Sequence, residues 1–277
     1  MTELPAGLLA ALDLEATGTG SFRAPSFGEA EGQLIFGGQL LAQTLLAASR
    51  VESSKAVKSI QLIFVRSGSV AQGVEIDVEA LHSGRTFSSA AVTIRQGDRA
   101  CTSALVLLAA PEDDLIRHST TMPSVTGPDQ TLPNNSASPW WEVRVVGGVN
   151  VADPNAVGPA VLDIWTRFPG APAEPPTNQA LLAYASDGFL IGTAMRPHHG
   201  VGQSLAHSSI ATTVITHTIA FHEPIDASEW MLLSHESPYS GRGGSYGRAN
   251  VFTQDGRLVA SFVQENMIRA MAQPKKE

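Results

Sequence analysis

The hydrophobic and polar positions follow two kinds of pattern along the chain, and their order occurs twice. Leucines at helical spacing predict a short amphipathic helix over residues 5–16, before a Gly/Ser/Pro-rich connection over residues 18–28. Residues 39–49 again have helical spacing and follow Phe36-Gly37-Gly38, so a second helix begins there. Alternating apolar runs separated by turn sequences then predict four β-strands, at residues 60–65, 74–81, 88–95 and 100–110.

The second half of the chain repeats this order. A polar segment rich in Pro, Ser and Asn separates the halves, and we expect an N-terminal unit over residues 1–112, a linker over 113–138 and a C-terminal unit over 139–277. The C-terminal unit has a predicted strand at 141–146, a long helix at 177–190 and four further strands, at residues 212–221, 229–236, 245–253 and 258–269.

Short sequence repeats agree with a duplication. Ser83-Gly84-Arg85 recurs 157 residues later as Ser240-Gly241-Arg242, and Phe64 recurs at the same displacement as Phe221. The next turn is displaced by 159 residues, from Gly97 to Gly256. This consistent displacement predicts that one structural unit occurs twice.

The predicted helices of both units are almost free of charge, which is typical of a helix buried on the concave side of a curved antiparallel sheet. Such a unit is a hot dog. Pairing two units edge to edge would give one continuous sheet and remove two exposed strand edges. We therefore predict the α+β class and a double hot dog.

Composition and charge exclude several classes. The net charge is −8, from 18 basic and 26 acidic residues, and no basic stripe is present, so we expect no nucleic-acid partner. The single cysteine excludes an internal disulfide framework and a zinc site built on several thiolates. No apolar stretch is long enough to span a membrane, and the N-terminus lacks a secretion signal, so we expect a cytoplasmic protein. Charged residues make up only 16%, which favours a homo-oligomer, a dimer or a tetramer.

Two polar residues occupy positions where apolar residues are expected. Asp187 ends the apolar helical segment Leu181–Ser186, where a carboxylate faces the negative end of the helix dipole. Gln264 lies in the apolar final strand, and its amide needs hydrogen-bond partners if it is buried. These two residues are the candidates for chemistry. The nucleophile-elbow, dinucleotide and P-loop motifs are absent.

Four motifs resemble those of the bacterial acyl-CoA thioesterase II family, to which the peroxisomal acyl-CoA thioesterases also belong. They are Phe36-Gly37-Gly38-Gln39, Tyr184-Ala185-Ser186-Asp187, His217-x-x-x-Phe221-His222-x-Pro224 and Thr253-Gln254-Asp255-Gly256 continuing to Glu265. The resemblance implies a double hot dog that hydrolyses acyl-CoA to a free fatty acid and coenzyme A, in fatty acid metabolism, with no cofactor and no metal.

The resemblance also implies site residues. An Asp, a hydroxyl residue and a Gln hold the attacking water in this family, and the motifs assign the Asp to Asp187 and the Gln to Gln264. The hydroxyl position falls on Val214, so Thr212 and Thr216, which we expect on the same strand face, are the candidate substitutes.

The start of the first long helix is the expected source of oxyanion donors, through the backbone N–H groups of Gly38 and Gln39. The repeat places Leu105 opposite Gln264, and residues 39–49 contain no carboxylate. We therefore expect one active site per chain.

Three functions are alternatives to acyl-CoA hydrolysis. A protein that binds acyl-CoA with weak or no hydrolysis is favoured by Val214. An enoyl-CoA hydratase would need a His soon after the helix, and Asp187-Gly188-Phe189 has none. A purely structural subunit would explain neither Asp187 nor Gln264.

Overall fold

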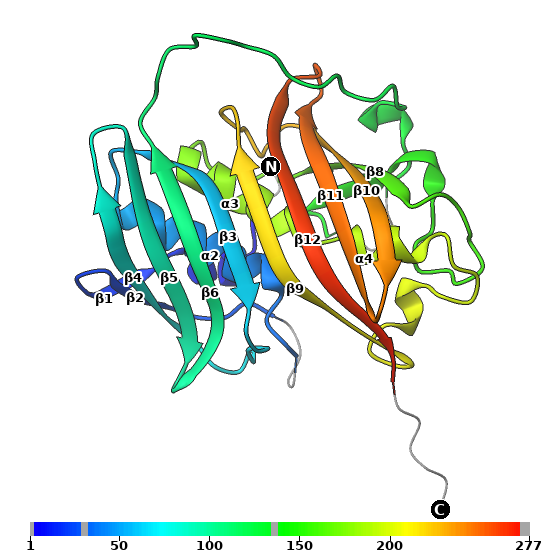
Figure 1. Cartoon of the computed structure of the whole chain (residues 1–277), viewed down its shortest axis with the longest axis horizontal. Helices are drawn as coiled ribbons and strands as arrows, with labels where there is room; N and C mark the ends of the chain where they lie inside the picture. The colour runs from blue at the N-terminus through cyan, green and yellow to red at the C-terminus, as the bar shows by residue number, and fades with distance from the viewer. Residues whose placement is uncertain (1–2, 29–32, 134–137, 272–277) are drawn as a thin grey trace, which may run out of the picture.

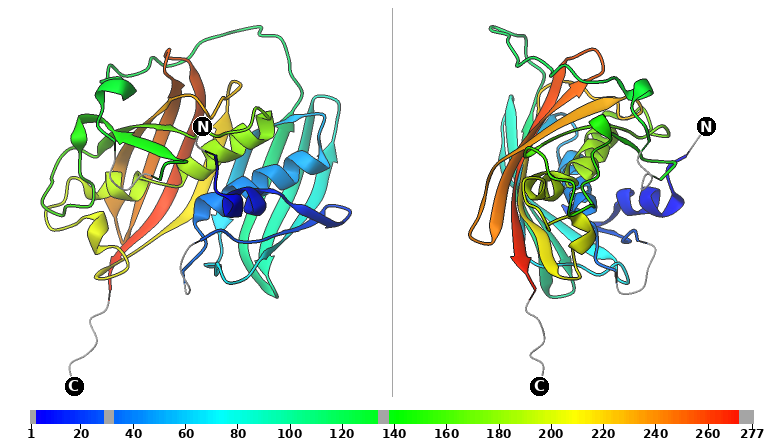
Figure 2. Two further views of the ribbon diagram at one scale, coloured as in Figure 1. Left: turned by 180° about the vertical axis from the view of Figure 1, so that it is seen from behind. Right: turned by 90° about the vertical axis from the view of Figure 1, so that its right-hand side faces the viewer.

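In the computed structural model, which describes residues 3–28, 33–133 and 138–271, the chain forms one antiparallel sheet of twelve strands with the helices on one face (Figures 1 and 2). The sheet order is β1-β2-β4-β5-β6-β3-β9-β12-β11-β10-β8-β7. The strands are β1 (Glu15–Gly18), β2 (Ser21–Ala24), β3 (Ala56–Phe64), β4 (Val74–Ser83), β5 (Phe87–Gln96), β6 (Arg99–Ala109), β7 (Glu142–Val145), β8 (Val161–Arg167), β9 (Ile210–Phe221), β10 (Met231–Gly241), β11 (Gly244–Thr253) and β12 (Leu258–Ala270). The α-helices are α1 (Ala6–Leu12), α2 (Gly37–Val51), α3 (Pro175–Ser186) and α4 (Leu190–Met195), and the short 3₁₀ segments are η1 (Pro128–Gln130), η2 (Val146–Gly148) and η3 (Gln203–Leu205).

The two halves of the described chain have the same strand order, reversed across the centre of the sheet. They join where β3 pairs antiparallel with β9. Within this pair, Gln61 lies opposite Thr218, the residue 157 positions later in the sequence. A pseudo-two-fold axis therefore passes through the centre of the sheet, and the predicted double hot dog with one continuous sheet is confirmed.

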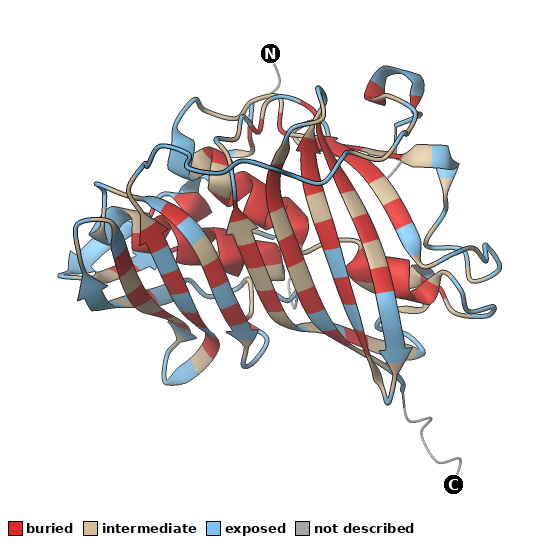
Figure 3. Cartoon of the chain, turned by 45° about the horizontal axis from the view of Figure 1, so that its top comes forward, coloured by how far each residue is buried: buried red, intermediate tan, exposed pale blue. Residues whose placement is uncertain are grey.

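The two long helices lie side by side on the concave face of the sheet (Figure 2). Every residue of α2 from Gly38 to Ala48 is buried, and so is every residue of α3 from Ala180 to Ser186. Along the strands, buried and exposed positions alternate, as the bands in Figure 3 show. Burial on nearly all faces explains why these buried stretches of the two helices contain no charged residue.

Several predicted elements differ in detail. The first helix ends at Leu12, and the hairpin β1–β2 occupies the end of the predicted helix and the start of the predicted connection, where it extends the sheet beside β4. The helix predicted over 177–190 ends at Ser186, and a separate helix, α4, begins at Leu190. Strand β8 was not predicted. Burial does not alternate along β8, because Ile164, Trp165 and Thr166 are all buried, so the period of two that identifies a strand is lost.

The predicted linker is exposed over residues 113–121 and packs against the protein from Met122 onward; residues 134–137 lie outside the described residues. Met122 and Val125 contact an apolar cluster on the sheet face opposite the helices, and the indole N–H of Trp165 donates to the carbonyl of Thr126 at 2.8 Å. The unit boundaries at 112 and 139 remain a prediction. No described helix has the length and hydropathy needed to cross a membrane.

Candidate active site

A cavity of about 940 Å³ opens at the seam between the two halves. The first half contributes Phe36, Gly37 and Phe64 to its wall, and the second half contributes Asp187 and Val214. The start of α2 and the end of α3 therefore meet at this cavity.

Asp187 reaches the cavity because α2 and α3 approach closely. A Cβ atom added to Gly37 would lie 2.6 Å from Oδ2 of Asp187, and one added to Gly38 would overlap the carbonyl oxygen of Tyr184. The glycine pair thus permits a contact between helix ends that any side chain would block. The backbone N–H of Gly38 forms a hydrogen bond with the carboxylate, whereas Oδ1 is buried without a partner among the described residues.

The electrostatics of Asp187 suit a proton acceptor. Burial raises the pKa of this carboxyl to about 7, and the hydrogen bond from Gly38 only partly offsets the shift. A carboxyl with a pKa near neutrality can exist in both protonation states under working conditions, as a general base requires.

Gln264 lies deeper than Asp187. It is fully buried on the helix side of β12, where it pairs with His217 of β9, and it does not line the cavity. Its Nε2 lies 3.2 Å from the carbonyl oxygen of Ser186 and 2.8 Å from Nδ1 of His217. Its Oε1 is buried without a partner among the described residues. Because Ser186 precedes Asp187, both candidate residues meet the end of α3.

A bulge in β9 separates the candidate hydroxyls. Thr216 lies opposite Glu265, but Val214 lies opposite Asn266, so Ile215 is an extra residue and the side-chain alternation reverses there. Thr212 and Val214 line the cavity. The expectation that Thr216 shares their face is wrong, because the bulge turns Thr216 to the other side of the sheet, where its hydroxyl lies 3.4 Å from Glu265.

The two expected oxyanion donors differ in what they contact. The backbone N–H of Gln39 donates to the carbonyl of Phe36 at 3.0 Å and closes the first turn of α2, so it is not free for a ligand. The N–H of Gly38 points to the carboxylate of Asp187. Gly37 lines the cavity directly.

The pseudo-symmetry corrects the predicted counterpart of Gln264. Leu105 pairs with Gln61 and is 54% exposed on the outer face, so it cannot match the fully buried Gln264. Val106, which pairs with the buried Ile60, occupies the equivalent position. Since Val106 and Ile60 are both apolar, the first half still lacks the polar pair formed by Gln264 and His217 in the second half.

Three residues of the site, Ser186, His217 and Phe189, were not predicted from the sequence. Ser186 and His217 join Gln264 in a buried hydrogen-bond network, with Oγ of Ser186 and Nε2 of His217 3.0 Å apart. Ser186 lies in the family motif that begins at Tyr184, and His217 begins another of these motifs. This membership was the signal that could have identified both residues. Phe189 lines the cavity with φ of 74°, a left-handed conformation that is rare for an aromatic residue and that turns the chain between α3 and α4.

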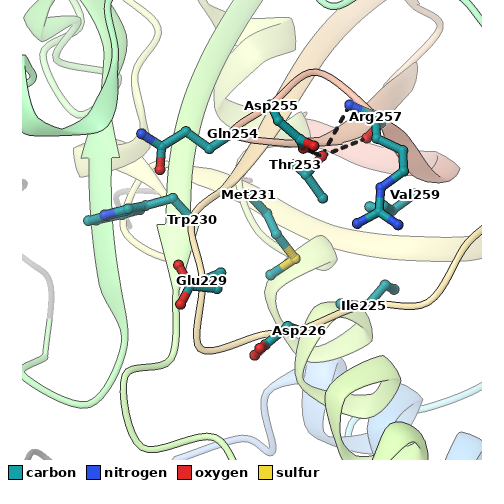
Figure 4. Close-up of a pocket in the computed structure, with 10 residues that line it drawn as sticks. All are labelled: Ile225, Asp226, Glu229, Trp230, Met231, Thr253, Gln254, Asp255, Arg257 and Val259. Atoms are coloured by element: carbon teal, nitrogen blue, oxygen red, sulfur yellow. Dashed lines mark hydrogen bonds between the residues drawn. The ribbon is translucent and has the colours of Figure 1, made fainter.

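A second cavity, of about 260 Å³, lies at the far end of β10 to β12 (Figure 4). Its wall includes the carboxylates of Asp226, Glu229 and Asp255 beside Arg257, and it contains none of the predicted site residues. Within the described residues, no group of three or more His, Cys, Asp or Glu side chains could hold a metal ion.

Solved structures of the same architecture identify the class. The tesB protein of Mycobacterium avium subsp. paratuberculosis is 29% identical to this chain with a TM-score of 0.81, covering 95% of this chain and 98% of its own. The acyl-CoA thioesterase II TesB2 of Mycobacterium marinum is 26% identical with a TM-score of 0.81, covering 96% and 99%. The fold and the cavity with its buried carboxylate thus define a double hot-dog thioesterase.

Sequence comparison identifies the family. The acyl-CoA thioesterase N-terminal domain matches residues 28–109, and the acyl-CoA thioesterase C-terminal domain matches residues 118–268. Acyl-CoA thioesterase 2 of Haemophilus influenzae is 32% identical over an alignment of 257 residues that covers 85% of this chain and 87% of that protein. Acyl-coenzyme A thioesterase 8 of the mouse is 28% identical over 291 residues, covering 95% and 88%. The chain belongs to the acyl-CoA thioesterase family, and the predicted resemblance is confirmed.

Proposed function

We propose that the chain hydrolyses acyl-CoA to a fatty acid and coenzyme A with a water molecule held between Asp187 and Gln264. The supporting observation is that both side chains present a buried oxygen without a donor, Oδ1 of Asp187 and Oε1 of Gln264. Unpaired buried acceptors are costly, and one water molecule can donate its two protons to two acceptors. The end of α3 brings the two groups to the same region.

In the reaction, the water oxygen attacks the thioester carbonyl while the carboxylate of Asp187 accepts a proton from the water. The tetrahedral intermediate carries a negative charge on the former carbonyl oxygen. The positive end of the α2 dipole, at Gly37, faces the same cavity and stabilises that charge. The C–S bond then breaks, and coenzyme A leaves as a thiolate whose pKa, about 8.5 for a thiol of this kind, needs little acid assistance. The proton passes from Asp187 to solvent or to the thiolate.

The cavity wall suits both parts of the substrate. Phe36, Leu40 and Phe64 give an apolar surface for the acyl chain. Arg66 is exposed at the same cavity and forms no ion pair within the described part of the chain, so its guanidinium is available to the phosphates of coenzyme A.

The Asp187→Asn variant tests this function. It preserves size and hydrogen bonding but cannot accept the proton, so kcat for acyl-CoA hydrolysis should fall by about 10²–10⁴-fold. Asp113→Asn, at an exposed linker position, is the matched control and should hydrolyse at the parent rate. Parent-like hydrolysis by Asp187→Asn would contradict the assignment.

A second function has one observation in its favour. Val214 occupies the position where the family places a hydroxyl, and it lines the cavity, so one hydrogen bond to the water is absent. The alternative is an acyl-CoA-binding protein with weak or no hydrolysis. Thermal stabilisation by coenzyme A without thiol release from a panel of acyl-CoAs would favour this alternative over the hydrolase.

We also propose that the chain forms a homo-oligomer through the outer face of its sheet. Ile63 and Leu105 are 55% and 54% exposed on neighbouring strands there, with Leu107 beside them. Apolar side chains clustered on an exposed sheet face indicate a protein interface. Light scattering coupled to size-exclusion chromatography should give at least twice the chain mass, and a monomer would contradict this proposal.

A further inference from the structure

The orientation of the Gln264 amide is fixed by Ser186. Backbone carbonyl oxygens only accept hydrogen bonds, and the Gln264 atom 3.2 Å from the carbonyl of Ser186 must therefore be the nitrogen, Nε2. With the amide reversed, two oxygens would face each other at this distance in a buried site. The carbonyl oxygen Oε1 thus points away from the backbone of α3.

This orientation determines the tautomer of His217. The second proton of Nε2 on Gln264 points to Nδ1 of His217 at 2.8 Å, so Nδ1 must be an unprotonated acceptor. The ring proton is then on Nε2, where it is donated to Oγ of Ser186 at 3.0 Å. Ser186 in turn donates its hydroxyl proton to the carbonyl of Ala183 at 2.8 Å. Every side-chain donor in this hydrogen-bond network therefore has an acceptor.

The same hydrogen-bond network excludes Ser186 as a nucleophile activated by His217. The Ser186 hydroxyl already donates to Ala183, and Nε2 of His217 carries a proton and cannot accept another. Ser186 and His217 are both fully buried and neither lines the cavity. The network therefore acts on Gln264 rather than on the substrate.

We propose that His217 is a positioning residue: as the neutral Nε2–H tautomer it holds the Gln264 amide with Oε1 free to accept a hydrogen bond from the attacking water. This inference rests on the proposed function, because it assigns to His217 the orientation of the amide that binds the water. Oε1 is the one polar atom of this network without a partner among the described residues.

The residues around His217 pack against its ring and keep the ring uncharged. Its ring stacks on Phe262 with ring centroids 5.5 Å apart and an angle of 16° between the planes. Burial lowers the pKa of His217 to about 3, so the ring stays uncharged at working pH. In the first half of the chain the equivalent pair is Ile60 and Val106, whose apolar side chains cannot form this hydrogen bond.

Two isosteric substitutions separate the roles of the ring nitrogens. In His217→Asn the amide oxygen can take the position of Nδ1, so Nε2 of Gln264 keeps its acceptor. In His217→Gln the amide extends to the position of Nε2, so Ser186 keeps its partner but Gln264 loses one. We expect kcat within about threefold of the parent for His217→Asn and about tenfold or more below it for His217→Gln, with KM unchanged in both.

A double-mutant cycle with Gln264→Leu tests whether His217 acts through Gln264. His217→Gln should lower kcat in the parent background and have no further effect in the Gln264→Leu background. His82→Gln is the control, since His82 is an exposed histidine of β4, a strand that pairs with β2 and β5 and not with β9 or β12. Its effect on kcat should be the same in both backgrounds.

The outcomes distinguish the two proposals. If Gln264→Leu lowers kcat but His217→Gln lowers it equally in both backgrounds, the positioning role of His217 is overturned while the function stands. If Gln264→Leu keeps the parent kcat, the proposed role of Gln264 itself fails, and the positioning role with it. Independently of activity, ¹⁵N NMR should show the His217 proton on Nε2 at pH 7, and a proton on Nδ1 would overturn the inference.

Discussion

Asp187 occupies a position that helix stability alone would not select. A carboxylate at the C-terminal end of α3 faces the negative end of that helix dipole, and burial adds a desolvation cost. The compensating group is the N-terminal end of α2, which the Gly37-Gly38 pair brings into contact with it. Burial destabilises the charged form and the hydrogen bond from Gly38 partly offsets this, so the pKa of Asp187 is raised to about 7.

The pH dependence of the reaction should report this carboxyl. Because Asp187 must be ionised to accept a proton and its pKa is raised to about 7 by burial, kcat/KM should increase with pH up to about 7 and stay constant above it. A pH–rate profile of the parent and of Asp187→Asn measures this. An inflection that persists unchanged in Asp187→Asn would assign it to another group.

The hydroxyl that contributes to the site should be Thr212. Thr212 lines the cavity on the same face as Val214, whereas Thr216 lies on the outer face near Glu265. Thr212→Val should lower kcat by about tenfold, since it removes one hydrogen-bonding group. Thr216→Val is the matched control. Equal losses in the two variants would contradict the placement that follows from the bulge.

Single residues in unusual surroundings were predictable from the sequence, but their neighbours were not. Asp187 and Gln264 were identifiable because each interrupts an apolar run. The partner His217 was not, because an alternating pattern does not show which of two facing strands supplies the hydrogen-bond acceptor. Thr216 was placed on the wrong face because a bulge leaves no mark in the hydrophobic pattern when both sides of it are threonine-rich.

At the scale of elements, the contact between the ends of α2 and α3 is the feature on which the site depends. Gly38→Ala should destabilise the protein, because its Cβ would overlap the carbonyl oxygen of Tyr184 and backbone atoms cannot move aside cheaply. We expect a decrease of about 1–3 kcal/mol in the free energy of unfolding, measured by denaturant titration. Gly127→Ala is the control, since nothing lies within 4 Å of its added Cβ and its φ is −64°. Equal stability of the two variants would contradict the close approach.

The two long helices also end in different carboxylates. Glu52 follows α2 as Asp187 follows α3, but Glu52 is held by Lys55 at 3.1 Å and by the hydroxyl of Ser88 at 2.9 Å. The hydrogen bonds from Ser54, Lys55 and Ser88 lower the pKa of Glu52 to about 2, whereas burial raises that of Asp187. A carboxylate with such partners is a poor base, so only the second half supplies one.

Long elements were predicted well, as was the short strand β7, whereas several other short elements were not. The two long helices and the eight central strands have enough regularly spaced apolar positions to define their period. The strands β1, β2 and β8 owe their structure to the neighbouring strands of the sheet, and the six-residue helix α4 depends on the turn at Phe189.

At the scale of the whole molecule, we expect the duplication to give one site and not two. The pseudo-two-fold axis at Gln61 and Thr218 would place a second site on the other side of the helix pair, but Ile60 and Val106 occupy the positions equivalent to His217 and Gln264. The carboxylate that follows α2 is the ion-paired Glu52. The repeat was predictable from its 157-residue displacement. The face on which each equivalent residue lies was not, because the displacement differs by one residue between strands.

The number of binding sites follows from this asymmetry. A thioether analogue of acyl-CoA, which cannot be hydrolysed, should bind with a stoichiometry of one per chain in isothermal titration calorimetry. Asp187→Asn should retain that stoichiometry, because the substitution changes the base and not the cavity wall. Two analogues bound per chain would show that the first half also forms a site.

The central claim is that water attacks the thioester directly, with Asp187 as base. It is tested most directly by a single turnover of acyl-CoA in H₂¹⁸O with the enzyme in excess, followed by mass spectrometry of the fatty acid and of the peptide containing Asp187. Direct attack by water on the thioester should leave one ¹⁸O atom in every fatty acid molecule and none in the peptide. Unlabelled fatty acid with ¹⁸O in Asp187 would show instead that the carboxylate attacks the thioester as a nucleophile.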